Sequence, residues 1–155
     1  MNKTLILGLG NSLLSDDAIG LKLVEKLAEE INQPEMEFKT SEKAGLNLIE
    51  LVQGYNQLII IDSVITGKYP VGTIIEYSPE DLPSNLRLRS PHDADFKTTI
   101  ELAKRIGIKM PEKITILGVE VLDNLTIQEE LTPQLSEKFP SLVEQIKEKL
   151  SQLIS

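Results

Sequence analysis

The chain opens with the sequence LILGLGNSLLSDDAIG over residues 5–20. Its first apolar residues suit a strand that is buried on both faces, and the two glycines that follow allow a tight backbone turn. Asp16 and Asp17 come where a helix should begin, and the free N–H groups of a helix start hold carboxylates in place. Capping needs only one carboxylate, so the stretch predicts a strand that delivers a second acid to the mouth of a cleft.

Composition indicates one soluble globular domain over residues 1–155. Hydrophobic residues make up 41% of the chain and charged residues 26%, which is the balance of a folded protein rather than a disordered one. The formal net charge is −8 and no segment concentrates Lys and Arg, which argues against nucleic-acid binding. With no cysteine, disulfides, thiolate metal sites and a cysteine nucleophile are excluded, so a metal would need N and O ligands.

Targeting signals are not expected. The apolar run before the Gly-Asn turn is too short for a signal peptide, and no run approaches the roughly 20 residues of a membrane span. We therefore expect a cytoplasmic protein without a membrane partner.

Strand and helix patterns alternate along the chain. Strands are expected over residues 4–9, 36–40, 58–62, 73–77 and 114–119, and helices over residues 17–31, 45–53, 96–106 and 140–154. The strand over residues 36–40 alternates apolar and polar side chains, which places it near the edge of the sheet. The order predicts a three-layer αβα fold: a mostly parallel twisted sheet of about five strands with helices on both faces.

Asp17 and Asp62 are both expected just past the carboxyl ends of strands, where ligands bind in such sheets. Asp62 could instead cap the next turn, and His92, the only histidine, could be an exposed loop residue. Two carboxylates and one imidazole in loops nevertheless suit a hard or borderline divalent ion with open coordination positions.

The Gly8-Leu9-Gly10 turn allows a nucleotide-binding interpretation. The dinucleotide fingerprint requires a third glycine where this chain has Leu13, and two acids at the helix start would repel a pyrophosphate. A dinucleotide site is therefore disfavoured, while a phosphate- or nucleotide-binding α/β domain stays an alternative.

Several segments together resemble the hydrogenase maturation endopeptidases. They are GLGNSLLSDDAIG (8–20), IIIDS (59–63), SPH (90–92), ILGVE (116–120) and LTP (131–133), and the similarity spans nearly the whole chain. The resemblance implies a single α/β domain that removes a C-terminal peptide from the precursor of a nickel-iron hydrogenase large subunit after nickel insertion.

The resemblance also implies the site residues. Three side chains of the family contact the metal, and they fall on Asp17, Asp62 and His92, which are thus both the catalytic and the metal-contacting candidates. Asp16 is expected to be structural, as the N-cap of the first helix. The resemblance implies nickel that is supplied by the substrate protein, with the free enzyme holding metal weakly or not at all. The alternative is a nickel-binding maturation chaperone that binds the same precursor without cutting it.

Overall fold

The computed structural model describes residues 2–43, 48–83, 86, 88 and 96–154. In these ranges a five-stranded sheet has the order β2-β1-β3-β5-β4. Its strands are β1 (Thr4–Leu9), β2 (Met36–Ser41), β3 (Gln57–Val64), β4 (Ile74–Tyr77) and β5 (Lys113–Glu120). The helices are η1 (Ser15–Ala18), α1 (Ile19–Glu30), α2 (Ile49–Val52), α3 (Phe96–Arg105) and α4 (Pro133–Leu153).

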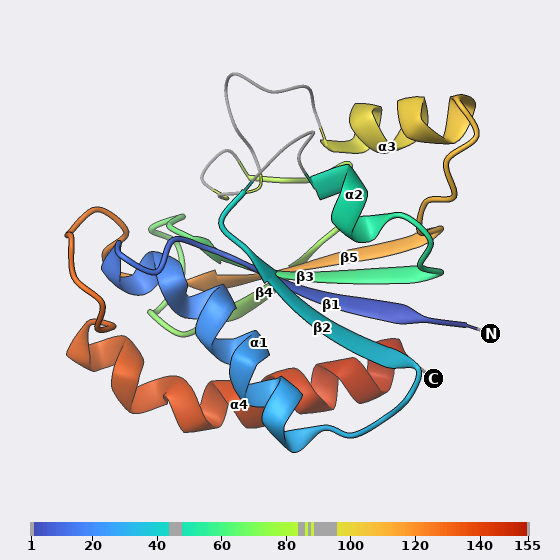
Figure 1. The fold of residues 1–155 in the computed structure, drawn as a ribbon. Coiled ribbons are helices and arrows are strands. Elements are labelled where there is room, and N and C mark those ends of the chain that lie inside the picture. The colour runs from blue at the N-terminus through green and yellow to red at the C-terminus, as the bar shows by residue number, and fades with distance from the viewer. Residues whose placement is uncertain (1, 44–47, 84–85, 87, 89–95, 155) are drawn as a thin grey trace.

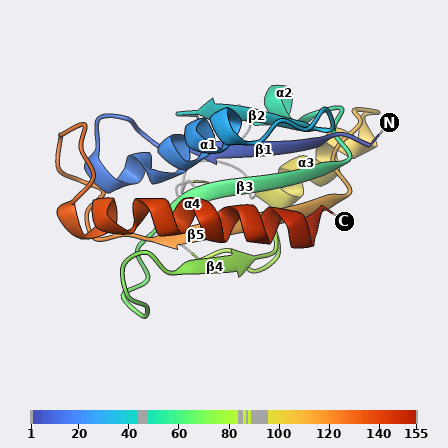
Figure 2. The ribbon, with the colours of Figure 1, turned by 90° about the horizontal axis from the view of Figure 1, so that it is seen from below.

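Two helical layers cover the sheet. Figure 1 shows α1 and α4 on one face and α2 and α3 on the other, and Figure 2 shows α1 and α4 side by side. Leu7 and Ile60 belong to the core beneath α2 and α3. Ile6 and Ile61 belong to the core against α1 and α4. Because alternate residues of one strand enter opposite cores, the central strands are apolar throughout, and the predicted three-layer αβα fold is confirmed.

The strand pairing is parallel except at one edge. β1 pairs with β2 and β3, and β3 with β5, all in parallel, while β4 runs antiparallel to β5. The connection from β3 to β4 contains no helix that could carry the chain back across the sheet, so β4 returns in the opposite direction. The predicted edge position of β2 is confirmed.

Two predicted helix starts are wrong. The first helix was expected from Asp17, but a 3-10 turn precedes α1, which begins at Ile19. The closing helix was expected from Pro140, but α4 begins at Pro133 and contains Pro140 in its interior. Pro133 suits the first helical position because its missing N–H would have no partner there, and the exposed Pro140 is tolerated seven positions later at the loss of one hydrogen bond.

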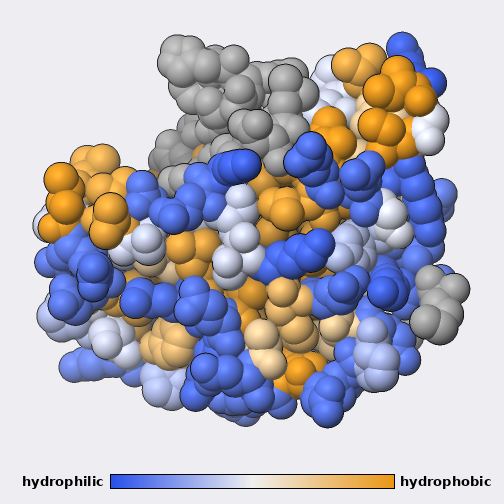
Figure 3. All heavy atoms as spheres, viewed as in Figure 1, coloured by the Kyte–Doolittle hydropathy of each residue, from blue (hydrophilic) through white to orange (hydrophobic). Residues whose placement is uncertain are grey.

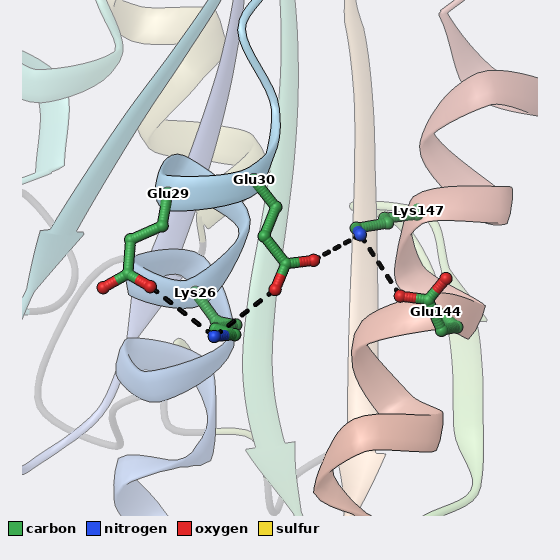
Figure 4. Close-up of polar contacts among 5 residues, drawn as sticks. All are labelled: Lys26, Glu29, Glu30, Glu144 and Lys147. Atoms are coloured by element: carbon green, nitrogen blue, oxygen red, sulfur yellow. Dashed lines mark hydrogen bonds and ion pairs between the residues drawn. The ribbon is translucent and has the colours of Figure 1, made fainter.

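An ion-pair cluster joins α1 to α4 on the surface (Figure 4). Lys147 of α4 donates a hydrogen bond to Glu30 of α1 and lies 3.2 Å from Glu144. Lys26 lies 3.4 Å from Glu30 and 3.6 Å from Glu29. The hydrogen bond from Lys147 lowers the pKa of Glu30 below its ordinary 4.5, and hydrogen bonds to Glu30 and Glu144 raise the pKa of Lys147 above 10.5.

The Glu30 pKa gives a testable acid dependence. A carboxyl whose pKa is lowered by folding contributes stability above its unfolded pKa and loses it as pH falls through the folded value. We therefore expect the stability advantage of the wild type over Lys147→Met to be present at pH 7, to begin to fall near pH 4.5 and to be lost as pH falls through the lowered pKa of Glu30, measured as free energy of unfolding in urea. The stability difference should be small because Glu30 and Lys147 lie on the surface. Adding 1 M salt should reduce it further at pH 7. A difference that persists unchanged at pH 3 would assign it to lost packing of the lysine stem instead.

Candidate active site

The strand order reverses between β1 and β3, at a point where ligands commonly bind in α/β sheets. From β1 the chain returns through α1 to β2 on one side, whereas β3 pairs with the other side of β1. The connections from the carboxyl ends of β1 and β3 therefore run toward opposite edges of the sheet, which is the arrangement at which α/β sheets commonly bind ligands. η1 follows the carboxyl end of β1.

Glycines bring the start of α1 against the strand ends. A Cβ atom on Gly20 would lie 2.4 Å from the carbonyl oxygens of both Leu9 and Ile61, and one on Gly10 would lie 2.2 Å from the carbonyl oxygen of Asp17. Only glycine permits this approach of backbone to backbone. The close packing fixes η1, which carries Asp17, beside the carboxyl end of β3.

Asp17 lies against Ser63 of β3. Its side chain is nearly buried, with 4% exposure, and its Oδ1 accepts a hydrogen bond from the Ser63 hydroxyl at 2.7 Å. This contact joins residues 46 positions apart, which the sequence analysis placed at the same edge of the sheet.

Asp62 lies inside β3, two residues before its end and not past it as the sequence predicted. The side chain is fully buried. Oδ1 accepts the Ser63 N–H at 2.9 Å and Oδ2 accepts the Leu88 N–H at 2.8 Å. Both oxygens therefore face N–H donors, an arrangement that suits an ionised carboxylate. The second contact also ties Leu88 to the site.

Ser63, which was not predicted as a site residue, connects the two acids. Its hydroxyl donates to Asp17 while its N–H donates to Asp62, so both carboxylates are held by one residue. A cation that reaches both carboxylates is attracted more strongly than it would be by either one alone. The pair can thus contact a metal ion or accept a proton from water. The only sequence feature that could have indicated the role of Ser63 is its position directly after Asp62 at the end of an apolar strand.

His92, the third predicted site residue, lies outside the described residues. Within residues 2–43, 48–83, 86, 88 and 96–154, no three His, Cys, Asp or Glu side chains are grouped so that they could hold a metal ion. Leu88, four positions before His92 in the sequence, contacts Asp62 as described above.

Asp16 has a structural role, although it does not cap the helix. η1 has no side-chain cap, so the predicted N-cap is wrong. The fully buried Asp16 carboxylate instead accepts the Thr132 N–H at 2.7 Å and the Thr132 hydroxyl at 2.9 Å. It also accepts the N–H groups of Leu122 and Asp123, both at 3.1 Å. Asp16 therefore fastens the β5–α4 connection to η1, beside Asp17.

The loop after β1 is not built to bind a phosphate. The backbone N–H groups of residues 12–17 all donate to acceptors within the protein. Phosphate loops use such groups to hold their ligand, and here they are engaged. This arrangement disfavours the nucleotide-binding alternative.

Fold and site together define an αβα protein with paired buried carboxylates where its strand order reverses. The family model described as hydrogenase maturation protease matches residues 21–149, so the chain belongs to the hydrogenase maturation protease family. The matched range includes Asp62 and begins after Asp17. The chain is accordingly a hydrolase of the protease class, as the sequence analysis predicted.

Individual relatives agree with this assignment. The chain is 30% identical to the hydrogenase 2 maturation protease of Escherichia coli K12 over 146 residues, 93% of this chain and 88% of the relative. The structure of the hydrogenase-maturating endopeptidase HybD from E. coli matches with a TM-score of 0.72 and 27% identity, over 97% of this chain and 93% of that one. The maturation protease HycI from Thermococcus kodakarensis shares the fold, with a TM-score of 0.73, 20% identity, and the same two coverages.

No helix in the described part of the chain is long and apolar enough to cross a membrane.

Proposed function

We propose that this protein removes the C-terminal extension from the large-subunit precursor of a nickel-iron hydrogenase after nickel has been inserted. The observation that carries the proposal is the placement of Asp17 and Asp62 on Ser63, at the edge where α/β sheets bind ligands, in a chain of the maturation protease family. Buried carboxylates fixed by hydrogen bonds are suited to a positively charged centre on the substrate, because they need little rearrangement when it arrives.

In this proposal nickel belongs to the substrate. Asp17, Asp62 and His92 contact the nickel that the precursor carries. The metal then polarises the scissile carbonyl or lowers the pKa of a bound water, and one of the carboxylates accepts the proton that the attacking water releases. The water oxygen bonds to the carbonyl carbon, the peptide C–N bond breaks, and the proton passes to the leaving amine.

Recognition of substrate nickel makes the reaction a checkpoint. A precursor without nickel lacks the group that the site recognises, so it is not cut. With two carboxylates and one imidazole the free enzyme offers fewer good ligands than a tight zinc site, so it should bind added divalent ions weakly.

The test is incubation of the purified protein with nickel-loaded precursor, followed by intact-mass spectrometry of both proteins. We expect the precursor to lose its C-terminal peptide, while precursor prepared without nickel keeps its mass. A stable complex with intact, nickel-loaded precursor would contradict proteolysis and support the non-cleaving chaperone. A nucleotide-dependent rise in melting temperature without any cleavage would support a nucleotide-binding domain.

A further inference from the structure

Exposed apolar side chains gather at the carboxyl edge of the sheet. Five of the seven large exposed hydrophobic residues in the described ranges lie on connections that leave the carboxyl ends of strands: Leu13, Tyr69, Leu122, Leu125 and Ile127. Figure 3 shows apolar atoms on the corner formed by the β5–α4 connection. Leu125 and Ile127 are each 82% exposed, so these side chains contribute almost nothing to packing within the protein. Grouped exposure of this kind marks interaction surfaces.

Four of these residues form what we call the apolar platform: Leu13, Leu122, Leu125 and Ile127. The platform is supported by hydrogen bonds between its two loops. The Ser15 N–H donates to the Gln128 carbonyl at 2.9 Å, and the Gln128 N–H donates to the Leu13 carbonyl at 3.0 Å.

The β5–α4 connection is fixed at two further points. At its start, the Leu122 N–H donates to the buried Asp16 carboxylate. Within the connection, Oδ1 of Asp123 accepts the N–H groups of Leu125 at 2.9 Å and Thr126 at 3.0 Å. The apolar side chains are thus presented on a backbone whose conformation is set before any partner arrives, which reduces the entropy lost on binding.

The two loops that carry the platform contain charges of one sign. Residues 10–18 and 120–132 contain six acidic residues and no Lys or Arg. Glu129 and Glu130 are exposed next to Ile127. A complementary partner surface is therefore apolar at its centre with lysine or arginine at its rim, and the acidic field would also steer such a partner toward this edge.

We propose that the apolar platform docks the folded body of the hydrogenase precursor, through an apolar surface bordered by basic side chains. The proposal rests on the proposed function. Asp16 accepts a hydrogen bond from Leu122 of the platform and Asp17 follows it in η1, so a protein bound to the platform reaches the edge of the sheet that holds the carboxylate pair. Docking of the folded body then adds to the affinity that the metal contacts provide. It also lets the enzyme recognise the precursor by a surface outside the C-terminal extension that is removed.

The test compares two double variants in the cleavage of nickel-loaded precursor. Leu125→Ser with Ile127→Ser removes half of the platform. Leu102→Ser with Ile106→Ser removes the remaining two of the seven exposed hydrophobic residues, which lie on and just after α3. We expect the platform variant to raise KM about 10-fold or more with kcat unchanged, since two apolar contacts are lost in binding alone. The α3 variant should leave both constants at wild-type values.

Charge reversal and a binding measurement complete the test. Glu129→Lys with Glu130→Lys should raise KM severalfold at low salt, and the increase should shrink at high salt. Equal KM values for the platform variant and wild type, in an enzyme that cleaves, would overturn the docking proposal and leave the proposed function standing. If wild type binds the precursor without cleaving it, the proposed function fails, and the dissociation constants of the same variants then decide the docking proposal alone.

Discussion

Replacing Asp17 by Asn should abolish precursor cleavage while the protein stays folded. Asparagine has nearly the same shape and its Oδ1 can still accept the Ser63 hydroxyl, so the buried contact at 2.7 Å is retained. The negative charge is lost, and with it the proposed contact to substrate nickel and the proposed capacity to accept a proton. Loss of a positioned acid–base group lowers the rate about 100- to 10,000-fold, and loss of a metal contact adds to this. The measurement is the rate of appearance of processed large subunit by mass spectrometry.

Glu35→Gln is the matched control for this variant. It removes one carboxylate charge from an exposed residue next to the amino-terminal end of β2, at the opposite edge of the sheet. We expect wild-type cleavage from it. Cleavage by Asp17→Asn at the rate of this control would remove Asp17 from the site.

Replacing Asp16 by Ala should do the opposite, destabilising the fold more than it impairs the chemistry. The fully buried carboxylate accepts four hydrogen bonds from Leu122, Asp123 and Thr132, whose donors would lose their acceptor. A hydrogen bond to a charged group contributes roughly 1.5–3 kcal/mol, and water can replace part of this, so we expect a loss of about 3 kcal/mol or more. An N-cap, the role that the sequence suggested, would account for only about 0.5–2 kcal/mol. Urea unfolding measures the difference.

Asp123→Ala is the control for the Asp16 variant. The Asp123 side chain also accepts several hydrogen bonds, which lower its pKa, but they come from Thr126 and Leu125 within one exposed loop. Its loss should change stability much less than the loss of Asp16. If Asp16→Ala were as stable as wild type but inactive, while Asp17→Asn cleaved normally, the roles given to the two adjacent acids would be reversed.

The fold was predictable because its central strands are buried on both faces. Continuous apolar segments such as residues 58–61 cannot lie on a surface, and their alternation with helical patterns leaves little choice but a parallel sheet between helical layers. The helix starts were harder to predict. The turn at Ser15–Ala18 and the interior position of Pro140 depend on packing against distant parts of the chain, which local patterns do not contain.

The candidate site was predictable in part. The rule that ligands bind at carboxyl ends of strands brought Asp17 and Asp62 to one edge without any knowledge of their contacts. Ser63 and the true role of Asp16 were missed because their partners lie 46 and more than 100 residues away. A hydrogen bond to a distant residue leaves no periodicity in the sequence, whereas an N-cap has a local signature, so the local interpretation of Asp16 prevailed.

The source of the metal separates this mechanism from that of a conventional metallopeptidase. The measurement is the cleavage rate of chelator-treated enzyme on precursor preparations of graded nickel content, with elemental analysis of the enzyme before and after. We expect an enzyme essentially free of metal that cleaves in proportion to the nickel in the precursor. Cleavage of nickel-free precursor at the same rate, or activity that returns only when stoichiometric zinc is restored to the enzyme, would contradict recognition of substrate nickel by Asp17, Asp62 and His92.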